Sequence, residues 1–241
     1  MKNHLKRLAA PKNWVLDRRV TKYIIKPNAG AHCLEKGLAL GFILRDILHV
    51  AERMDEIKKI LATTEILVDG VVRREHRFMV GLFDVLSIPA LQKHYRVVLD
   101  SKGRITIVEI PAAESTVKVS KVVGKSIVVG GKVQLHLHDG RNVLSDVKVS
   151  VGDSVVVSVP KLVVKEVLSA KKGMSVFLHQ GKHAGDVGVL EELKDGLAVY
   201  TSANKTHGAA HAKVKGKVIT SGSYIFVVGA QGKPVCTVVP K

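Results

Sequence analysis

Residues 36–63 repeat their hydrophobic positions every three to four residues, which is the spacing of an amphipathic α-helix. Asp55 is of a residue type that caps helices, so a second helix is expected to begin there. Lys58 and Lys59 then point away from its buried face. The apolar positions that define the two helices are Leu38, Phe42, Ile47 and Leu48 in the first, and Ile57, Ile60 and Leu61 in the second.

Beyond residue 63 the pattern changes to alternation with period two, which predicts β-strands. Two short apolar runs flank Asp69-Gly70, a dipeptide favoured in tight hairpins because both central residues take positive φ. Further strands are expected at 82–88, 96–99 and 105–108. A dense cationic cluster follows the hairpin and consists of Arg73, Arg74, His76 and Arg77.

From Thr116 onward, valine-rich runs alternate with turn signals, and almost every segment is expected to be β. Short strands with this spacing favour small barrels over a parallel α/β sheet. The fold class predicted is therefore mixed α+β and mostly β. The turn signals are Gly130-Gly131, Asp139-Gly140, Gly152-Asp153, Asp195-Gly196 and Gly232-Lys233-Pro234.

Composition narrows the broad class of protein. Hydrophobic residues make up 46% of the chain, which excludes disorder of the whole chain. No apolar run approaches the roughly 20 residues that span a bilayer, and the basic start lacks the apolar core of a signal peptide. Cys33 and Cys236 are the only cysteines, so we expect no disulfide framework and a reducing compartment.

Charge points to a polyanionic partner. The 241 residues include 38 Lys and Arg against 21 Asp and Glu, a formal net charge of +17. Nucleic acid, an acidic membrane surface or an acidic protein could each be attracted by such a field. With only 1 Trp, 4 Tyr and 5 Phe, base stacking has few platforms. Phosphate contact and recognition of RNA shape fit better.

The first 27 residues carry eight basic residues against one acid, Asp17, and Pro11 and Pro27 interrupt any long helix. Such a segment is expected to extend along a polyanion and become ordered there, with Trp14 as an anchor. The far end of the chain is also basic, since no acid follows Asp195.

The candidate catalytic motifs each lack residues or elements that their chemistry requires. Gly124-Lys125-Ser126 lacks the upstream glycine and following helix of a phosphate loop. His136 and His138 share one face of a strand and could ligate one metal, but phosphate or backbone contact, or simple exposure, explains them better. No nucleophile elbow occurs. We expect no enzyme activity, metal, cofactor or small-molecule substrate.

Residues 176–190 combine apolar strand positions with glycines at 181, 185 and 188. Glycine permits positive φ and a close approach of the backbone to phosphates. Lys182 and His183 supply donors at the tip of this turn. The pattern fits a nucleic-acid-contacting loop, and an ordinary barrel loop remains the alternative.

The ordered set of these segments resembles the archaeal and eukaryotic type of ribosomal small-subunit protein four. Gly30-Ala31-His32 departs from the family's Gly-Pro-His turn, and Leu38-Ala39-Leu40 lacks a proline common in the family, so the chain leading into the first helix is expected to be less constrained. The matching segments include residues 3–8, 10–12, 14–18, 44–46, 56–61, 68–73, 81–88, 102–104, 137–142, 181–185 and 226–229.

The resemblance implies four parts: a basic extended arm at 1–37, a two-helix RNA-binding domain with hairpins at 38–110, a central β-domain at 111–172, and a barrel with a KOW motif at 173–241. It also implies a structural role in the cytoplasmic ribosome. The chain would bind small-subunit rRNA of the 16S type and neighbouring ribosomal proteins, and support assembly and translation. No membrane partner or cofactor is implied.

We expect RNA contacts from the arm, the helix-and-hairpin face and the glycine loop. An RNA-modifying enzyme, or a transient translation or transcription factor built from the same modules, is the alternative. The expected contacts are Lys2, His4, Lys6, Arg7, Lys12, Trp14, Arg18, Arg19, Arg45, Lys58, Lys59, Arg73, Arg74, Arg77, Arg141, Lys182, His183 and Gly185.

Overall fold

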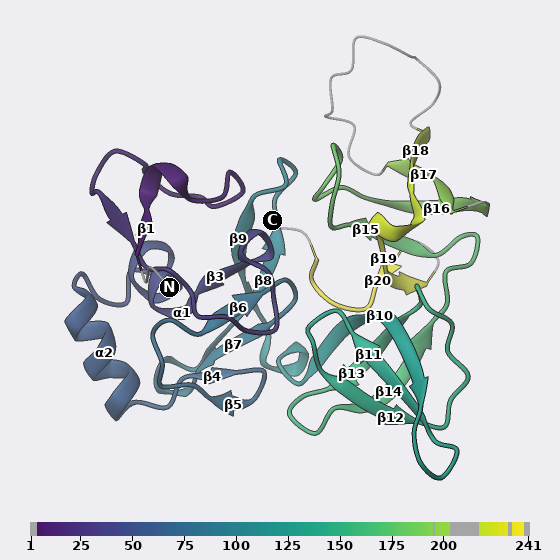
Figure 1. The fold of residues 1–241 in the computed structure, drawn as a ribbon, viewed down its shortest axis with the longest axis horizontal. Helices are drawn as coiled ribbons and strands as arrows, with labels where there is room; N and C mark the ends of the chain where they lie inside the picture. The colour runs from purple at the N-terminus through teal and green to yellow at the C-terminus, as the bar shows by residue number, and fades with distance from the viewer. Residues whose placement is uncertain (1–3, 195, 203–216, 231–232, 239–241) are drawn as a thin grey trace. The chain divides into compact units, whose positions relative to one another are not determined.

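A computed structural model describes residues 4–194, 196–202, 217–230 and 233–238 (Figure 1). The described chain is mostly β with two α-helices, which confirms the mixed α+β class. No helix in these ranges combines the length and hydropathy needed to cross a membrane. Two compact units are present: one contains residues 1–98 and 104–116, the other 99–103 and 117–241. The predicted domain boundaries at residues 37, 110 and 172 stay predictions.

The first unit contains the helices and several small antiparallel sheets. The described strands form a two-stranded sheet β1-β2, a two-stranded sheet β3-β6 and a five-stranded sheet in the order β5-β4-β7-β8-β9. The helices are α1 (Leu40–Phe42), which continues into a π-helical turn (Ile43–Ile47), and α2 (Met54–Thr63). The strands are β1 (Leu5–Lys6), β2 (Tyr23–Ile24), β3 (Gly37–Ala39), β4 (Leu67–Val68), β5 (Val71–Val72), β6 (Met79–Gly81), β7 (Val85–Ile88), β8 (Lys93–Leu99) and β9 (Ile105–Ile110).

Both predicted helices are present, but their starts differ from the expectation. The first begins at Leu40, and α2 begins at Met54 with Arg53 as its N-cap. The expected cap at Asp55 is wrong, because the Glu56 carboxylate accepts a hydrogen bond from the Arg53 N–H at 3.1 Å and closes the first turn. The Asp55 carboxylate instead pairs with Lys58 at 3.1 Å.

The predicted hairpin at Asp69-Gly70 is confirmed. Asp69 and Gly70 have φ of 49° and 70° and connect β4 to β5. The buried Asp69 carboxylate accepts a hydrogen bond from the Val85 N–H at 2.9 Å, which ties the turn to β7. The strand expected at 82–88 begins only at Val85, because Phe83 has a φ of 65° and breaks the extended backbone.

The basic N-terminal segment is folded onto the first unit, where an extended arm was expected. Trp14 is 2% exposed and stacks on Phe42, with ring centroids 6.0 Å apart. Its indole N–H donates to the Leu34 carbonyl oxygen at 3.3 Å, and Leu5 of β1 pairs with Ile24 of β2. Burial of this ring provides apolar contacts that hold the segment against the first unit, and a count of charges does not reveal them.

The second unit contains two antiparallel sheets in its described part. Their strand orders are β12-β11-β10-β13-β14 and β18-β17-β16-β15-β19-β20. The strands of the first sheet are β10 (Val117–Ile127), β11 (Val133–Leu137), β12 (Asn142–Ser145), β13 (Ser154–Ser158) and β14 (Val163–Leu168). Those of the second are β15 (Ser175–Leu178), β16 (Val187–Lys194), β17 (Leu197–Ser202), β18 (Lys217–Ser221), β19 (Ile225–Ala230) and β20 (Lys233–Pro234).

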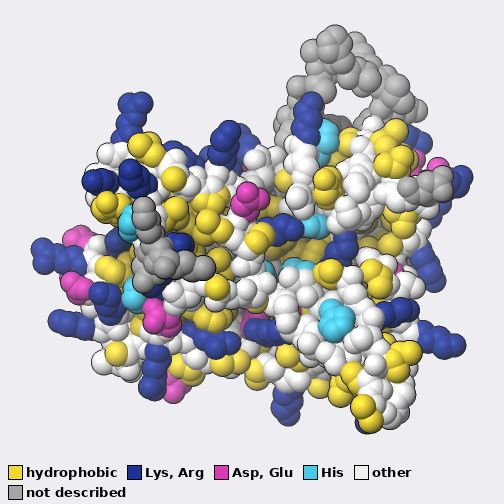
Figure 2. Space-filling view, in the orientation of Figure 1, with side chains coloured by type: hydrophobic (Ala, Val, Ile, Leu, Met, Phe, Trp, Pro, Cys, Tyr) yellow, Lys and Arg dark blue, Asp and Glu magenta, His cyan; other side chains and the backbone are white. Residues whose placement is uncertain are grey.

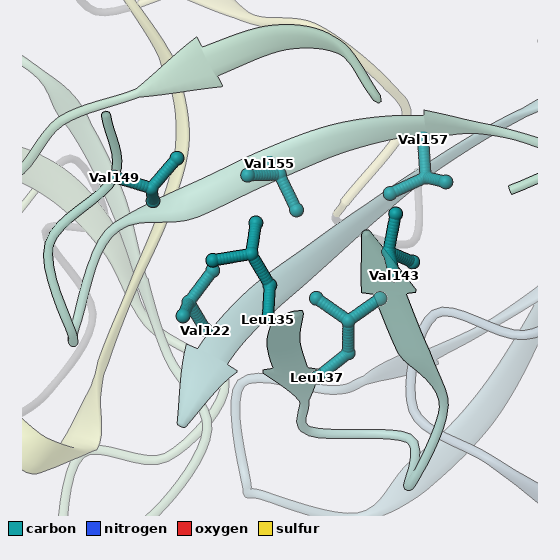
Figure 3. Close-up of a cluster of buried hydrophobic side chains, with 7 residues drawn as sticks. All are labelled: Val122, Leu135, Leu137, Val143, Val149, Val155 and Val157. Atoms are coloured by element: carbon teal, nitrogen blue, oxygen red, sulfur yellow. The ribbon is translucent and has the colours of Figure 1, made fainter. Parts of the chain in front are cut away.

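Valine and leucine side chains fill the core of the five-stranded sheet and point toward one another (Figure 3). The two sheets of this unit are also joined by buried polar contacts. The Lys121 ammonium group donates to the carbonyl oxygens of Ser223 and Ile225 at 2.7 and 2.6 Å. The core cluster consists of Val122, Leu135, Leu137, Val143, Val149, Val155 and Val157.

Candidate nucleic-acid interface

Two arginines of the N-terminal segment use their donors inside the protein. The buried Arg7 donates to the Asp17 carbonyl oxygen at 2.7 Å, and its guanidinium lies 3.5 Å from the Asp46 carboxylate. Arg18 donates to the carbonyl oxygens of Ala10 and Pro11 at 2.9 and 2.8 Å. These arginines, together with Trp14, hold the segment in a defined conformation and face protein.

The other cations of this segment lie on its surface. His4, Lys6, Lys12 and Arg19 are exposed. Arg19 also lines a hollow of about 540 Å³ together with Asp17, Arg18 and Val20. Lys2 lies outside the described residues. The exposed cations therefore lie on a backbone whose conformation is stabilised by the hydrogen bonds of Arg7 and Arg18.

The helix-and-hairpin face presents three exposed cations, Lys58, Lys59 and Arg74. The remaining predicted residues of this face are half-buried and engaged within the protein. The Arg73 guanidinium lies 4.4 Å from the centroid of the Phe78 ring. The other two engaged residues are Arg45, which pairs with Asp46 at 2.7 Å, and Arg77, whose Nε donates to the Lys26 carbonyl oxygen at 2.9 Å.

The glycine loop between β15 and β16 has the expected backbone conformation. Gly181 and Gly185 have φ of 93° and 89°, whereas Gly188 lies inside β16 without a positive φ. The loop closes through a hydrogen bond from the Gly185 N–H to the Leu178 carbonyl oxygen at 2.8 Å. Lys182 is exposed in this loop and His183 is half-buried.

Gly185 itself faces protein. It is buried, and a Cβ atom at this position would overlap the carbonyl oxygen of Asp100 in the 99–103 turn of the same unit. Nearby, a Cβ at Gly103 would lie 3.1 Å from the Cβ of Ala184. The close approach that glycine permits is therefore an approach to another turn, and it fixes the loop that carries Lys182.

A buried carboxylate, which sequence reasoning missed, anchors the end of the same loop. Asp186 accepts hydrogen bonds from the Tyr200 hydroxyl at 3.0 Å, the Ser202 hydroxyl at 2.9 Å and the Val187 N–H at 2.9 Å. Burial, reinforced by the Asp186 charge, raises the pKa of Tyr200 well above its ordinary value. An acid directly after a loop glycine was the available signal.

Arg141 lies in the turn between β11 and β12 and is half-buried. Its Nε atom is 3.9 Å from the Asp139 carboxylate, which also accepts a hydrogen bond from the Lys118 ammonium at 2.9 Å. Lys118 and Asp139 are both buried. This ion pair fixes the turn and leaves part of the Arg141 side chain exposed.

The imidazoles of His136 in β11 and His138 in the following turn each hydrogen-bond to other groups of the protein. His136 Nδ1 lies 2.8 Å from the Asn142 amide oxygen, and its Nε2 lies 3.0 Å from the Ser126 hydroxyl. His138 Nδ1 accepts a hydrogen bond from the Lys121 N–H at 3.3 Å. Within the described ranges no group of three metal-ligating side chains occurs.

On the visible face in Figure 2, Lys and Arg side chains are spread widely while Asp and Glu side chains are few. This basic, mostly β chain resembles proteins of one class, the ribosomal proteins. A family described as "Ribosomal family S4e" matches residues 91–164, and a domain described as "RS4NT (NUC023) domain" matches residues 1–35. The chain belongs to the ribosomal S4e family, which confirms the resemblance drawn from the sequence.

Relatives match over nearly the whole length. The small ribosomal subunit protein eS4 of Methanocella arvoryzae is 39% identical over 233 residues, with 97% of each chain covered. That of Methanosphaera stadtmanae is 38% identical over 238 residues, covering 99% of this chain and 96% of the relative. The crystal structure of the 30S ribosomal protein S4e from Thermoplasma acidophilum superposes with a TM-score of 0.66 at 29% identity, covering 83% of this chain and 98% of that one.

Proposed function

We propose that this chain is a structural constituent of the small ribosomal subunit that binds small-subunit rRNA and supports subunit assembly and translation. Full-length relatives are named small ribosomal subunit protein eS4, and the formal charge of +17 matches a phosphate-rich partner. As part of the ribosome, the chain would be cytoplasmic. Its other partners would be neighbouring ribosomal proteins.

The main support for the proposal is that the N-terminal segment contains two kinds of cation: arginines that bond within the protein, and cations that are exposed. Buried Arg7 and half-buried Arg18 bond to backbone carbonyls, while Lys6, Lys12 and Arg19 on the same segment are exposed. A fixed backbone presents these charges without the entropy cost of ordering a tail on the RNA. We assign this exposed set to phosphate contact.

Three further surfaces extend the assignment, one in the first unit and two in the second. In the first unit, Lys58, Lys59 and Arg74 are exposed on α2 and after the β4–β5 hairpin. In the second unit, the β15–β16 loop presents Lys182 with His183 beside it, and the β11–β12 turn presents Arg141. Arginine suits bidentate phosphate contacts and lysine contributes a diffuse charge.

The same proposal includes the modules inferred from the resemblance. Residues 38–110 form the two-helix RNA-binding domain, residues 111–172 the central β-domain, and residues 173–241 the barrel that contains the KOW motif. The β15–β16 loop is the RNA-contacting loop of that motif, with its conformation held by Gly185 and Asp186. Catalysis has no part in this function.

Binding of the full chain to a small-subunit rRNA fragment tests the proposal. The logarithm of affinity should fall linearly with the logarithm of salt concentration, because phosphate contacts release counterions. The variant K59Q/R74Q, at two exposed cations without a carboxylate partner in the described chain, should reduce that slope by about 0.7 to 0.9 per lost contact. K194Q/K217Q removes the same charge from lysines paired with Glu192 and Glu191, and should change the slope little.

A second measurement separates the alternatives. A structural constituent stays with small subunits through a high-salt wash, whereas a transient translation or transcription factor is released. An RNA-modifying enzyme would leave a modified base after incubation with unmodified rRNA. A flat salt dependence, release in the wash or a modified base would each overturn the proposal.

A further inference from the structure

The hairpin formed by β10 and β11 ends in hydrophobic side chains that the protein leaves in solvent. Val129 is fully exposed, and Ile127 and Val123 are 79% and 60% exposed. Isolated apolar residues on a surface need no explanation, but this set occupies one hairpin. Water contacts these aliphatic groups unless a partner covers them, and burial of each would stabilise a complex.

The hairpin is well formed up to its tip. Ile127 pairs with Val133, and the Val128 N–H donates to the Lys132 carbonyl oxygen at 2.9 Å. Gly130 and Gly131 turn the chain with φ of 88° and 74°. No heavy atom lies within 4 Å of a Cβ built at either glycine, so backbone conformation, and not packing, requires them. The tip is therefore a regular turn in open space.

The base of the hairpin is anchored in the protein core. Val122 on β10 and Leu135 on β11 are fully buried among the valines and leucines of the five-stranded sheet (Figure 3). Two strands that leave a packed core as a paired ladder hold their tip in place. A partner would meet a pre-organised apolar edge, which lowers the entropy cost of binding.

Charge identifies the chemistry of the partner. Between Val117 and Leu137 the chain has four lysines and no acid. Lys118 and Lys121 are buried and bonded within the unit, whereas Lys125 and Lys132 are exposed on either side of the tip. A surface that combines aliphatic groups with cations only is complementary to a polyanion that has apolar faces of its own, and nucleic acid is such a partner.

We propose that the tip of the β10–β11 hairpin inserts Ile127 and Val129 against rRNA bases, while Lys125 and Lys132 contact the flanking phosphates. Aliphatic side chains wedge between base steps in other nucleic-acid complexes, and the wide, shallow minor groove of RNA admits such a tip. This inference rests on the proposed function and adds a contact surface to it. The Lys125 ammonium donates a hydrogen bond to the Val149 carbonyl oxygen at 3.4 Å, while its side chain stays exposed.

We call the hairpin tip in this proposal the wedge. Affinity measurements on the full chain separate its aliphatic contacts to bases from its lysine contacts to phosphates. I127S/V129S should weaken binding to a small-subunit rRNA fragment about tenfold or more at one salt concentration, because two aliphatic contacts are lost. Its salt slope should match that of the wild type. K125Q/K132Q should instead lower the slope. V163S, at an exposed valine of β14 in the same unit, is the matched control and should bind as the wild type does.

The partner is identified by photo-crosslinking. A photoreactive amino acid at Val129 of the full chain, in assembled small subunits, should crosslink to RNA. A crosslink to a neighbouring protein would overturn the wedge and identify the hairpin as a protein contact. Unchanged affinity of I127S/V129S in a chain that binds rRNA would also overturn it. Failure of the wild type to bind rRNA would instead remove the proposed function, and the wedge with it.

Discussion

The Tyr200 hydroxyl group donates a hydrogen bond to the Asp186 carboxylate at 3.0 Å, and both side chains are buried. Asp186 ends the β15–β16 loop, and Tyr200 lies on β17, which pairs with β16. The bond therefore links the loop that presents Lys182 to the adjacent hairpin ladder. Its loss would act on the loop through the protein interior.

Tyr200→Phe should destabilise the chain by about 1–3 kcal/mol, because a buried carboxylate loses one of its donors. Urea unfolding followed by circular dichroism measures the change. Tyr23→Phe is the control, since Tyr23 is exposed in the first unit and the change should lie within about 0.5 kcal/mol. Equal stabilities of the two variants would show that the Asp186–Tyr200 bond contributes nothing.

Alkaline pH should weaken the fold through the same tyrosine. Burial and the Asp186 charge raise the pKa of Tyr200 in the folded chain, so its neutral form is favoured there. The unfolded chain ionises near pH 10, so this stabilisation is complete below that pH and is lost as pH rises above it. Unfolding free energy should fall more steeply above pH 10 in the wild type than in Tyr200→Phe. Parallel curves would contradict the linkage.

Gly185→Ala should be among the most damaging single-methyl changes in the chain. Gly185 has a φ of 89°, and the added Cβ would overlap the Asp100 carbonyl oxygen. The expected loss is about 3 kcal/mol, from a strained backbone and a displaced turn. Gly152→Ala is matched in φ, at 99°, but meets no atom within 4 Å, so it should cost only the strain of about 1–2 kcal/mol. Thermal melts of both variants measure the difference.

The sequence predicts local backbone conformation, but it does not predict which side chains are buried or bonded in the folded chain. The Asp69-Gly70 turn was predictable because positive φ is a property of those two residues. Arg7 and Arg18 stay predicted RNA contacts, but charge alone does not predict that backbone carbonyl oxygens accept their hydrogen bonds. Lys118 lies between two valines of β10, a pattern typical of an exposed strand position, yet its side chain is buried.

Trp14→Ala should loosen the N-terminal segment from the first unit. The indole ring stacks on Phe42 and donates to the Leu34 carbonyl oxygen, so its removal leaves a cavity and an unpaired acceptor. A loss of about 3–5 kcal/mol is expected. Limited proteolysis should cut the variant within residues 4–27 faster than the wild type. Val20→Ala, at an exposed position of the same segment, should leave the cleavage rate unchanged.

Lys118→Met should cost about 3–5 kcal/mol, because it leaves the buried Asp139 carboxylate without its closest cation. The Arg141 guanidinium, 3.9 Å from the same carboxylate, would offset part of this loss. The double variant K118M/D139N should be more stable than Lys118→Met alone, since it removes the uncompensated charge together with its partner. Urea unfolding of the two single variants and the double variant forms a cycle that isolates the pair. Additive losses would mean that Lys118 and Asp139 stabilise the turn of Arg141 independently. A coupling of about 1 kcal/mol or more would show that the turn is held by the ion pair itself.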